Sequence, residues 1–185
     1  MINAITDFDF LILNFIQSTL TGSVADKVMI IASRLTDGGF LWLIIALILI
    51  LIPKQRKNGL FLLLSLGLAL IIGSFIIKPL VARARPFLSN EAFHLLITAP
   101  RDFSFPSGHT LTSFAAAVTL FRVHRAAGIS ALVFAALVAF SRMYLYVHFP
   151  SDVLVGLILG ISIGVLTLFL ARRVESNIKK TQGTT

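Results

Sequence analysis

The sequence predicts an all-α protein, a multi-pass transmembrane helical bundle with about five spans and one or two N-terminal amphipathic helices. Two observations lead to this fold class. Of the 185 residues, 57% are hydrophobic, and they fall in several uninterrupted runs of the length that membrane spans need. Basic residues gather in the short polar stretches between the runs, as is typical of cytoplasmic loops. The sequence contains no cysteine, which excludes disulfides, iron–sulfur clusters and thiolate zinc sites.

Residues 1–36 are predicted to form helices that lie in the membrane interface. Apolar residues recur at helical spacing from Ile5 to Leu20, with polar residues at most other positions. No cleavable signal peptide is expected, because a basic leading region is missing and acidic residues interrupt the apolar ones. A second short amphipathic helix is expected over residues 24–35, ended by Asp37-Gly38-Gly39. The pattern leaves open whether the first helix lies in the interface or spans the membrane.

Residues 37–174 are predicted to form the transmembrane core of a single domain that covers residues 1–185. The expected spans are residues 40–52, 60–77, 107–121, 126–140 and 150–171. The hydroxyl side chains of the third span, such as those of Thr110 and Ser113, are expected to face other helices. The aromatic residues Trp42, Tyr144 and Tyr146 fit a belt at the membrane surface.

The distribution of basic residues predicts the orientation of the chain in a cell membrane. Five spans place nine of the sixteen Lys and Arg residues on one face, namely Lys54, Arg56, Lys57, Arg122, Arg125, Arg172, Arg173, Lys179 and Lys180. The positive-inside rule makes this face cytoplasmic, and with it a polar tail over residues 175–185 that includes the C-terminus. The loop of residues 78–105 and the turn of residues 141–149 are then extracytoplasmic.

The same threading brings several charged residues to the extracytoplasmic face. Lys78 ends the second span and His109 begins the third, while Arg142, His148 and Asp152 flank the turn between the last two. Charged groups at membrane depth are costly and usually functional. Taken singly, each has an ordinary alternative, such as capping a helix or anchoring its end among headgroups. Together with Arg85, the cations form a cluster suited to an anion such as phosphate.

Three motifs contain these residues. The first is Lys78, six residues, then Arg85-Pro86. The second is Pro106-Ser107-Gly108-His109, in which Ser107 is expected to cap the third span. The third is Ser141-Arg142, five residues, His148, three residues and Asp152. In this set the chain resembles the type 2 phosphatidic acid phosphatase family, integral membrane lipid phosphatases, over about residues 25–172.

The resemblance implies a role for each motif residue. His148 would be the nucleophile that forms a phosphohistidine, and Asp152, one helical turn on, would hold its other ring nitrogen. His109 would protonate the leaving oxygen and later activate water. The remaining motif residues would bind the phosphoryl oxygens through side chains or amides: Lys78, Arg85, Arg142, Ser107 and Gly108. Neither a metal nor another cofactor is expected.

The expected function is hydrolysis of a lipid phosphate or diphosphate at the outer face of the membrane, with undecaprenyl diphosphate as the foremost candidate. Phosphatidylglycerophosphate or broad phosphatidate phosphatase activity is the alternative, because the motifs bind the phosphate and do not contact the lipid. A non-catalytic lipid or anion transporter is the alternative from another class. The predicted partners are the lipid substrate and the bilayer, and no nucleic acid. Residues outside the motifs are expected to be ordinary loop residues, with headgroup contact left open for two of them, Arg83 and His94, and none expected for Glu91, Arg101 and Asp102.

Overall fold

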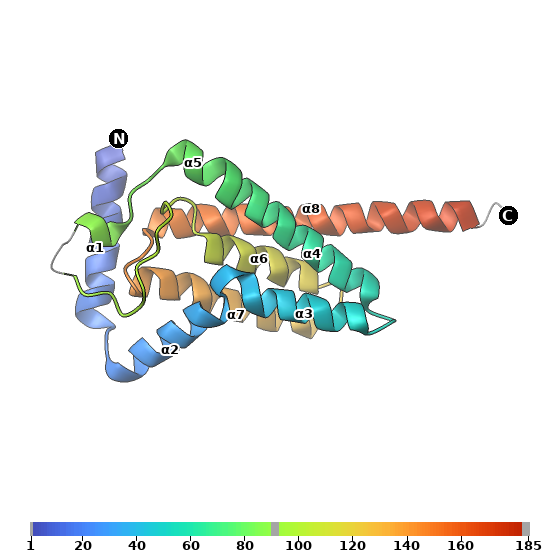
Figure 1. The fold of residues 1–185 in the computed structure, drawn as a ribbon, viewed down its shortest axis with the longest axis horizontal. Helices are drawn as coiled ribbons and strands as arrows, with labels where there is room; N and C mark the ends of the chain where they lie inside the picture. Colours follow the sequence, from blue (N-terminus) through green and yellow to red (C-terminus); the bar gives the residue numbers. More distant parts are fainter. Residues whose placement is uncertain (1, 90–92, 183–185) are drawn as a thin grey trace.

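The computed structural model describes residues 2–89 and 93–182, which form helices joined by loops (Figure 1). In chain order these are α1 (Ile2–Thr19), α2 (Ser23–Leu35), η1 (Asp37–Gly39), α3 (Phe40–Leu51), α4 (Arg56–Leu70), η2 (Ile71–Ile77), α5 (Lys78–Val81), η3 (Pro86–Ser89), α6 (Gly108–Leu120), α7 (Arg125–Tyr144) and α8 (Pro150–Gln182). The predicted all-α class is confirmed. The predicted tail continues α8 to Gln182, while Glu91 and residues 183–185 lie outside the described residues.

Helix α6 lies at the centre of the bundle and packs against α4, α7 and α8 (Figure 1). Glycines of α8 allow the closest of these approaches. A Cβ atom added to Gly160 would lie 2.6 Å from the carbonyl oxygen of Leu111, and one added to Gly164 would lie 2.5 Å from Cβ of Val118. Small residues let membrane helices approach backbone to backbone. The N-termini of α6 and α8 therefore meet at one end of the bundle, where the amide of Ser107 donates to the carbonyl of Asp152 at 3.1 Å.

Three segments of the described chain are long and apolar enough to cross a membrane on their own: Arg56–Ser89, Arg125–Tyr144 and Pro150–Ile178. A fourth is obtained if Ser23–Leu35 and Asp37–Leu51, which meet at 45°, form one broken span. The expected third span corresponds to α6, which has 13 residues. Because α6 is enclosed by other helices, it needs neither the length nor the apolar surface of a lipid-facing span.

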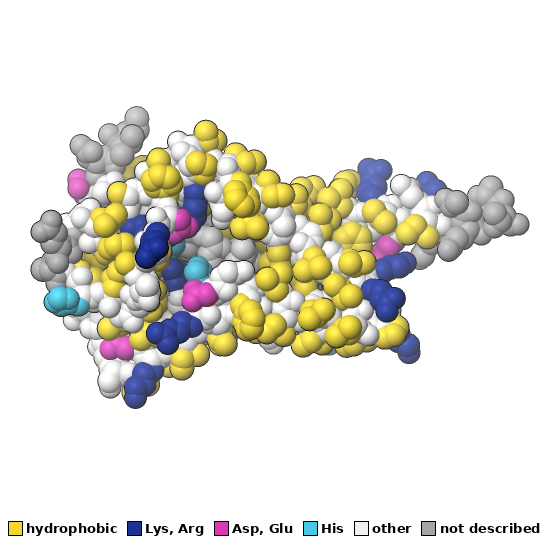
Figure 2. All heavy atoms as spheres, viewed as in Figure 1, with side chains coloured by type: hydrophobic (Ala, Val, Ile, Leu, Met, Phe, Trp, Pro, Cys, Tyr) yellow, Lys and Arg dark blue, Asp and Glu magenta, His cyan; other side chains and the backbone are white. Residues whose placement is uncertain are grey.

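The outer surface of the bundle is apolar around its middle, and Lys and Arg lie towards both ends, whereas most of the visible Asp and Glu lie at the end away from the projecting part of α8 (Figure 2). Helix α1 also has exposed apolar side chains. It exposes Phe8, Leu11 and Phe15 but buries Asp9 and Leu13 against the protein. These exposed apolar residues of α1 suit contact with lipid. The predicted amphipathic character of α1 is thus confirmed, and α1 is not among the segments that could span a membrane.

The expectation of an interfacial aromatic belt is wrong for the three residues named. Trp42, Tyr144 and Tyr146 are all buried. The indole of Trp42 donates to the hydroxyl of Ser113 at 3.0 Å, and the hydroxyl of Tyr144 donates to the carboxylate of Asp26 at 2.5 Å. A buried aromatic residue with a polar tip needs such a partner, and helices of this bundle supply it. The prediction that Thr110 and Ser113 face other helices is confirmed, since both are buried.

Candidate active site

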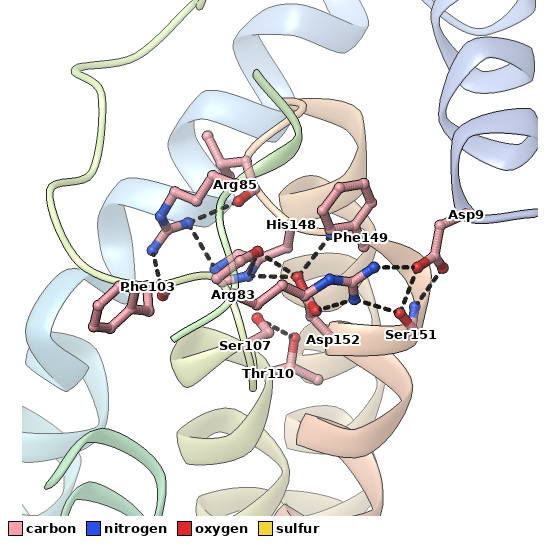
Figure 3. A network of polar contacts seen from close by, with 12 residues as sticks. Asp9, Arg83, Arg85, Phe103, Ser107, Thr110, His148, Phe149, Ser151 and Asp152 are labelled. Carbon is pink, nitrogen blue, oxygen red and sulfur yellow. Dashed lines mark hydrogen bonds and ion pairs between the residues drawn. The ribbon is translucent and has the colours of Figure 1, made fainter. Parts of the chain in front are cut away.

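The predicted site residues come together at the end of the bundle where α6 and α8 begin and α7 ends. His109 is in the first turn of α6 and Arg142 is in the last turn of α7. His148 lies in the turn between α7 and α8, and Asp152 follows in the first turn of α8. The chain between α5 and α6 crosses this end and adds Arg83 and Arg85 to it (Figure 3).

His148 and Asp152 form a buried pair (Figure 3). Nδ1 of His148 lies 3.5 Å from Oδ2 of Asp152. The two residues are four apart in sequence, the spacing that brings side chains together over one helical turn. The same carboxylate oxygen accepts a hydrogen bond from the hydroxyl of Ser104 and one from the amide of Phe149 at 2.9 Å. These donors keep Asp152 ionised and aim it at His148.

Burial lowers the pKa of His148 to about 3, although Asp152 acts in the opposite direction. The charges of Arg85 and Arg142 lower the pKa further. His148 is therefore neutral at physiological pH. Because Nδ1 faces Asp152, the ring nitrogen available for attack is Nε2, which lies 3.2 Å from Nη1 of Arg85. A neutral histidine with one nitrogen held and the other directed at a cation is arranged as a nucleophile for a bound anion.

Lys78 and Arg85 converge on the carboxylate of Asp102. Lys78 donates to one oxygen, and Nη2 of Arg85 donates to the other at 2.6 Å. Arg85 is fixed further by the carbonyl of Val147, which accepts from Nη1 at 2.7 Å. Burial would raise the pKa of Asp102, but hydrogen bonds and charge from Lys78 and Arg85 outweigh it and lower the pKa to about 2. Asp102 is thus an anion held by the two cations that were predicted to bind phosphate.

Arg142 lies on the other side of the same cavity. It is almost fully buried, and its Nη1 donates to the hydroxyl of Ser33 in α2. Its Nε is buried and has no hydrogen-bond partner among the described residues. An unpaired buried guanidinium donor is costly, and a bound phosphoryl oxygen would satisfy it.

His109 is oriented by a carboxylate that the sequence analysis did not identify as functional. Its Nε2 lies 2.8 Å from Oδ1 of Asp37, which begins the 3-10 turn η1. The turn itself was predicted, as the end of the second helix, but not this contact. Each of the two motif histidines is therefore held by an aspartate, Asp152 for His148 and Asp37 for His109.

Ser107 differs from its expected role. Its amide, which was predicted to be free for phosphate, donates to the carbonyl of Asp152. Its hydroxyl accepts from Thr110 at 2.9 Å and makes no capping bond to α6 within the described structure. Ser107 thus joins α6 to α8 and does not line the cavity, whereas Gly108 does line it. The reason is the close approach of α8, which places a carbonyl where the first free amide of α6 points.

The cavity between these groups measures about 660 Å³. One part of its wall is polar and contains the five cationic or histidine side chains that the sequence predicted together: Lys78, Arg85, His109, Arg142 and His148. Another part is apolar and comes from α3 and α4, through Leu43, Leu63, Leu66 and Leu70. Several of these leucines also reach the outer surface of the bundle. The cavity can therefore hold an anionic group joined to an apolar chain.

Four residues that contact the site were not among the predicted site residues, namely Arg83, Asp37, Asp102 and Ser104. All lie outside the motifs and on the predicted extracytoplasmic side. Their signal was weak: an acidic or basic residue near a membrane helix end is common. His94, for which a headgroup contact was left open, and Arg101, for which none was expected, do not line the cavity.

A helical membrane protein with a buried His–Asp pair, a second histidine and a cluster of cations has the features of a membrane phosphatase. Residues 58–175 match the model of the PAP2 superfamily. The chain belongs to this superfamily and is a membrane lipid phosphatase.

Similar proteins and structures agree with this assignment. An undecaprenyl-diphosphatase of Sulfolobus acidocaldarius is 35% identical over 144 residues, which are 76% of this chain and 68% of that protein. The undecaprenyl-diphosphatase BcrC of Bacillus subtilis is 30% identical over 144 residues, 78% of this chain and 74% of the relative. The crystal structure of a transmembrane PAP2-type phosphatidylglycerolphosphate phosphatase from Bacillus subtilis superimposes with a TM-score of 0.78 at 28% identity, covering 93% of this chain and 88% of the other.

The position of Asp102 generates a first prediction. Asp102→Asn removes the anion from Lys78 and Arg85, so inorganic phosphate should inhibit the enzyme more strongly, with an inhibition constant lower by roughly three- to tenfold. The measurement is phosphate inhibition of the purified enzyme with an aryl phosphate substrate. Asp7→Asn, an exposed residue of α1 with the same charge change, should leave the constant unaltered. An unchanged or higher constant in Asp102→Asn would mean that the carboxylate orders the two cations and does not compete with phosphate.

Proposed function

We propose that the protein hydrolyses a lipid diphosphate, most specifically undecaprenyl diphosphate to undecaprenyl phosphate and inorganic phosphate. The observation behind this proposal is the cavity, in which cations and His148 form one part of the wall and leucines, several of them exposed, form another. The functions of the two relatives at 35% and 30% identity support the choice of substrate. A phosphatidylglycerophosphate substrate is the second candidate, favoured by the structural match at a TM-score of 0.78.

The proposed reaction has two steps. Nε2 of His148 attacks the terminal phosphorus, so that an N–P bond forms while the P–O bond to the lipid phosphate breaks. His109, held by Asp37, gives a proton to the departing oxygen. Water then attacks phosphorus, the N–P bond breaks, and His109 accepts a proton from that water. Asp152 stabilises the positive charge that His148 acquires in between.

The cations act on the phosphoryl oxygens during both steps. Lys78, Arg85 and Arg142 line the same cavity as His148 and offset charge that spreads over the transferring group. The reaction is proposed to be independent of metal. Divalent cations need several oxygen ligands, and no group of three His, Asp or Glu among the described residues is arranged to hold one.

We further propose that the active site faces the outside of the cell membrane and that the C-terminus is cytoplasmic. The support is the run of basic residues in the loops of residues 54–57 and 122–125 and in the C-terminal part of α8. An outward-facing site would act on lipid diphosphates of the outer leaflet.

The orientation can be tested by cysteine labelling, because the chain has no cysteine of its own. Ala99→Cys, in the loop beside the cavity, should react with an impermeant thiol reagent in intact cells. Ala126→Cys, at the start of α7, is the matched control and should react only after the cells are opened. Both positions are exposed. The reverse pattern would rule out an outer-leaflet substrate.

The substrate can be tested by phosphate release from detergent-solubilised enzyme. Undecaprenyl diphosphate, phosphatidylglycerophosphate and phosphatidate are compared in parallel, with and without EDTA. We expect kcat/KM for the diphosphate to be highest by roughly tenfold or more, because a lipid phosphate leaves more readily than an alkoxide. EDTA should have no effect. A preference for phosphatidylglycerophosphate would select the second candidate, and loss of activity in EDTA would contradict the metal-independent mechanism.

The two histidines can be distinguished by their dependence on the leaving group. His148→Ala should abolish turnover and any acid-labile phosphoenzyme with every substrate. His109→Ala should reduce hydrolysis of phosphatidate by roughly 10²–10⁴-fold but that of an activated aryl phosphate much less, since a good leaving group needs no proton. The measurement is rapid quench of the reaction with substrate that is radiolabelled in its transferred phosphate. Phosphate trapped on His109, or substantial activity in His148→Ala, would show that the roles are assigned wrongly.

A further inference from the structure

Arg83 lies outside the three motifs, in the link between α5 and η3, yet its side chain points into the site (Figure 3). Nη1 donates to Oδ1 of Asp152 at 2.6 Å and to the hydroxyl of Ser151 at 2.7 Å. The guanidinium also stacks on the ring of Phe149, with 3.9 Å between its carbon and the ring centroid. Arg83 is therefore fixed by a planar contact and by hydrogen bonds to the first turn of α8.

Asp9 of α1 holds the other end of Arg83. Its Oδ2 accepts from Nη2 of Arg83 at 2.8 Å, and its two oxygens also accept from the amide and hydroxyl of Ser151 at 2.9 and 2.5 Å. Asp9 is only 2% exposed, although its neighbours in the helix, such as Phe8 and Leu11, are exposed. A buried carboxylate with all of its bonds directed at one arginine and one helix end is a specific connection and not a solvated surface charge.

The network divides the two oxygens of Asp152 between two tasks. Oδ2 faces His148 and accepts from Ser104 and the amide of Phe149, whereas Oδ1 binds Arg83. The terminal torsion of an aspartate is broad, so partners on both oxygens decide how the carboxylate is turned. The contact from Oδ2 to Nδ1 of His148 is 3.5 Å. Since this distance is long for a hydrogen bond, the alignment of Asp152 with His148 during the reaction depends on how firmly Oδ1 is held.

The charges in the network have a second effect. Arg83 alone would neutralise Asp152 and weaken its attraction for the positive ring that His148 becomes. Asp9 shares the guanidinium, so that Asp9, Arg83 and Asp152 together keep one net negative charge beside His148. In a poorly solvated site, such a charge has a large effect on a developing cation.

We propose that Asp9 and Arg83 are positioning residues for the reaction, and that α1 is part of the catalytic unit. They fix the rotation and the charge of Asp152 and thereby act on His148. This inference rests on the proposed role of the His148–Asp152 pair. Asp9 lies outside residues 58–175, the part of the chain that the family model matches. The proposed positioning of Asp152 therefore involves a segment that contains none of the three motifs.

The test compares Asp9→Asn with Asp7→Asn, which makes the same charge change on an exposed position of the same helix. We expect Asp9→Asn to lower kcat by roughly tenfold with KM within about twofold, the scale seen when an outer hydrogen-bonded support of a reactive group is removed. Asp7→Asn should behave as the unaltered protein. Each variant is assayed as monodisperse folded protein in detergent, with its thermal unfolding measured.

A second readout separates positioning from a merely structural role. Vanadate resembles the transition state of phosphoryl transfer and would bond to Nε2 of His148, whereas inorganic phosphate resembles the ground state. Asp9→Asn should weaken vanadate binding by the same factor as kcat and leave phosphate binding unaltered. A structural defect would reduce the amount of folded enzyme and its unfolding temperature without separating the two inhibitors.

Arg83→Lys provides the third comparison, since an ammonium keeps the charge but does not bridge two carboxylates. It should show the same parallel loss in kcat and vanadate affinity. Adding Asp9→Asn to Arg83→Lys should then cost less than about twofold more, because Asp9 acts through Arg83. Arg83→Lys, which keeps Asp9, supplies the test by itself if Asp9→Asn does not fold.

The inference is overturned if Asp9→Asn keeps its kcat within twofold, if vanadate and phosphate affinities change equally, or if the losses in the double variant multiply. His148→Ala is assayed alongside to keep two failures apart. If that variant stays active, the proposed function itself is wrong. If it is inactive while Asp9→Asn and Arg83→Lys are normal, only the role of the network is refuted.

Discussion

The buried charge of Asp152 is the constraint on which the rest of the site depends. An ionised carboxylate with no exposed surface costs several kcal/mol unless charged and hydrogen-bonding partners surround it. Here the partners come from separate parts of the chain: Ser104 and Arg83 from the α5–α6 link, and His148 from the turn before α8. Satisfying one carboxylate therefore gathers the loop, the turn and, through Arg83, helix α1 around a single point.

Helix packing positions Asp152 relative to the other site residues. The glycines of α8 let α6 approach until Ser107 and Asp152 are joined backbone to backbone. This contact fixes the start of α6, and hence His109, relative to the start of α8. The two histidines thus line one cavity because two helix N-termini are held together, and their carboxylates, Asp37 and Asp152, reach them from different elements.

The wall of the cavity has two chemically different parts. Its cations and histidines sit on motif positions and suit any phosphate ester or anhydride, whatever the lipid. Its leucines come from α3 and α4, and α3 lies outside the motifs and outside the segment that the family model matches. In the proposed function, the polar part of the wall contacts the phosphate and the leucines contact the lipid chain.

By itself the sequence determined the helical membrane class and the place of most helices, because apolar runs and their periodicity are local properties. It also determined that five site residues meet, because counting the spans places them at the same end of the bundle: Lys78, Arg85, His109, Arg142 and His148. It did not determine the span count, since α6 is short and enclosed by other helices. Only the tertiary structure decided that Ser107 binds Asp152, that Asp37 holds His109 from 72 residues away, and that Arg83 links Asp152 to Asp9. These contacts join distant segments through the burial of charge, and no local pattern specifies which buried charge will need which partner.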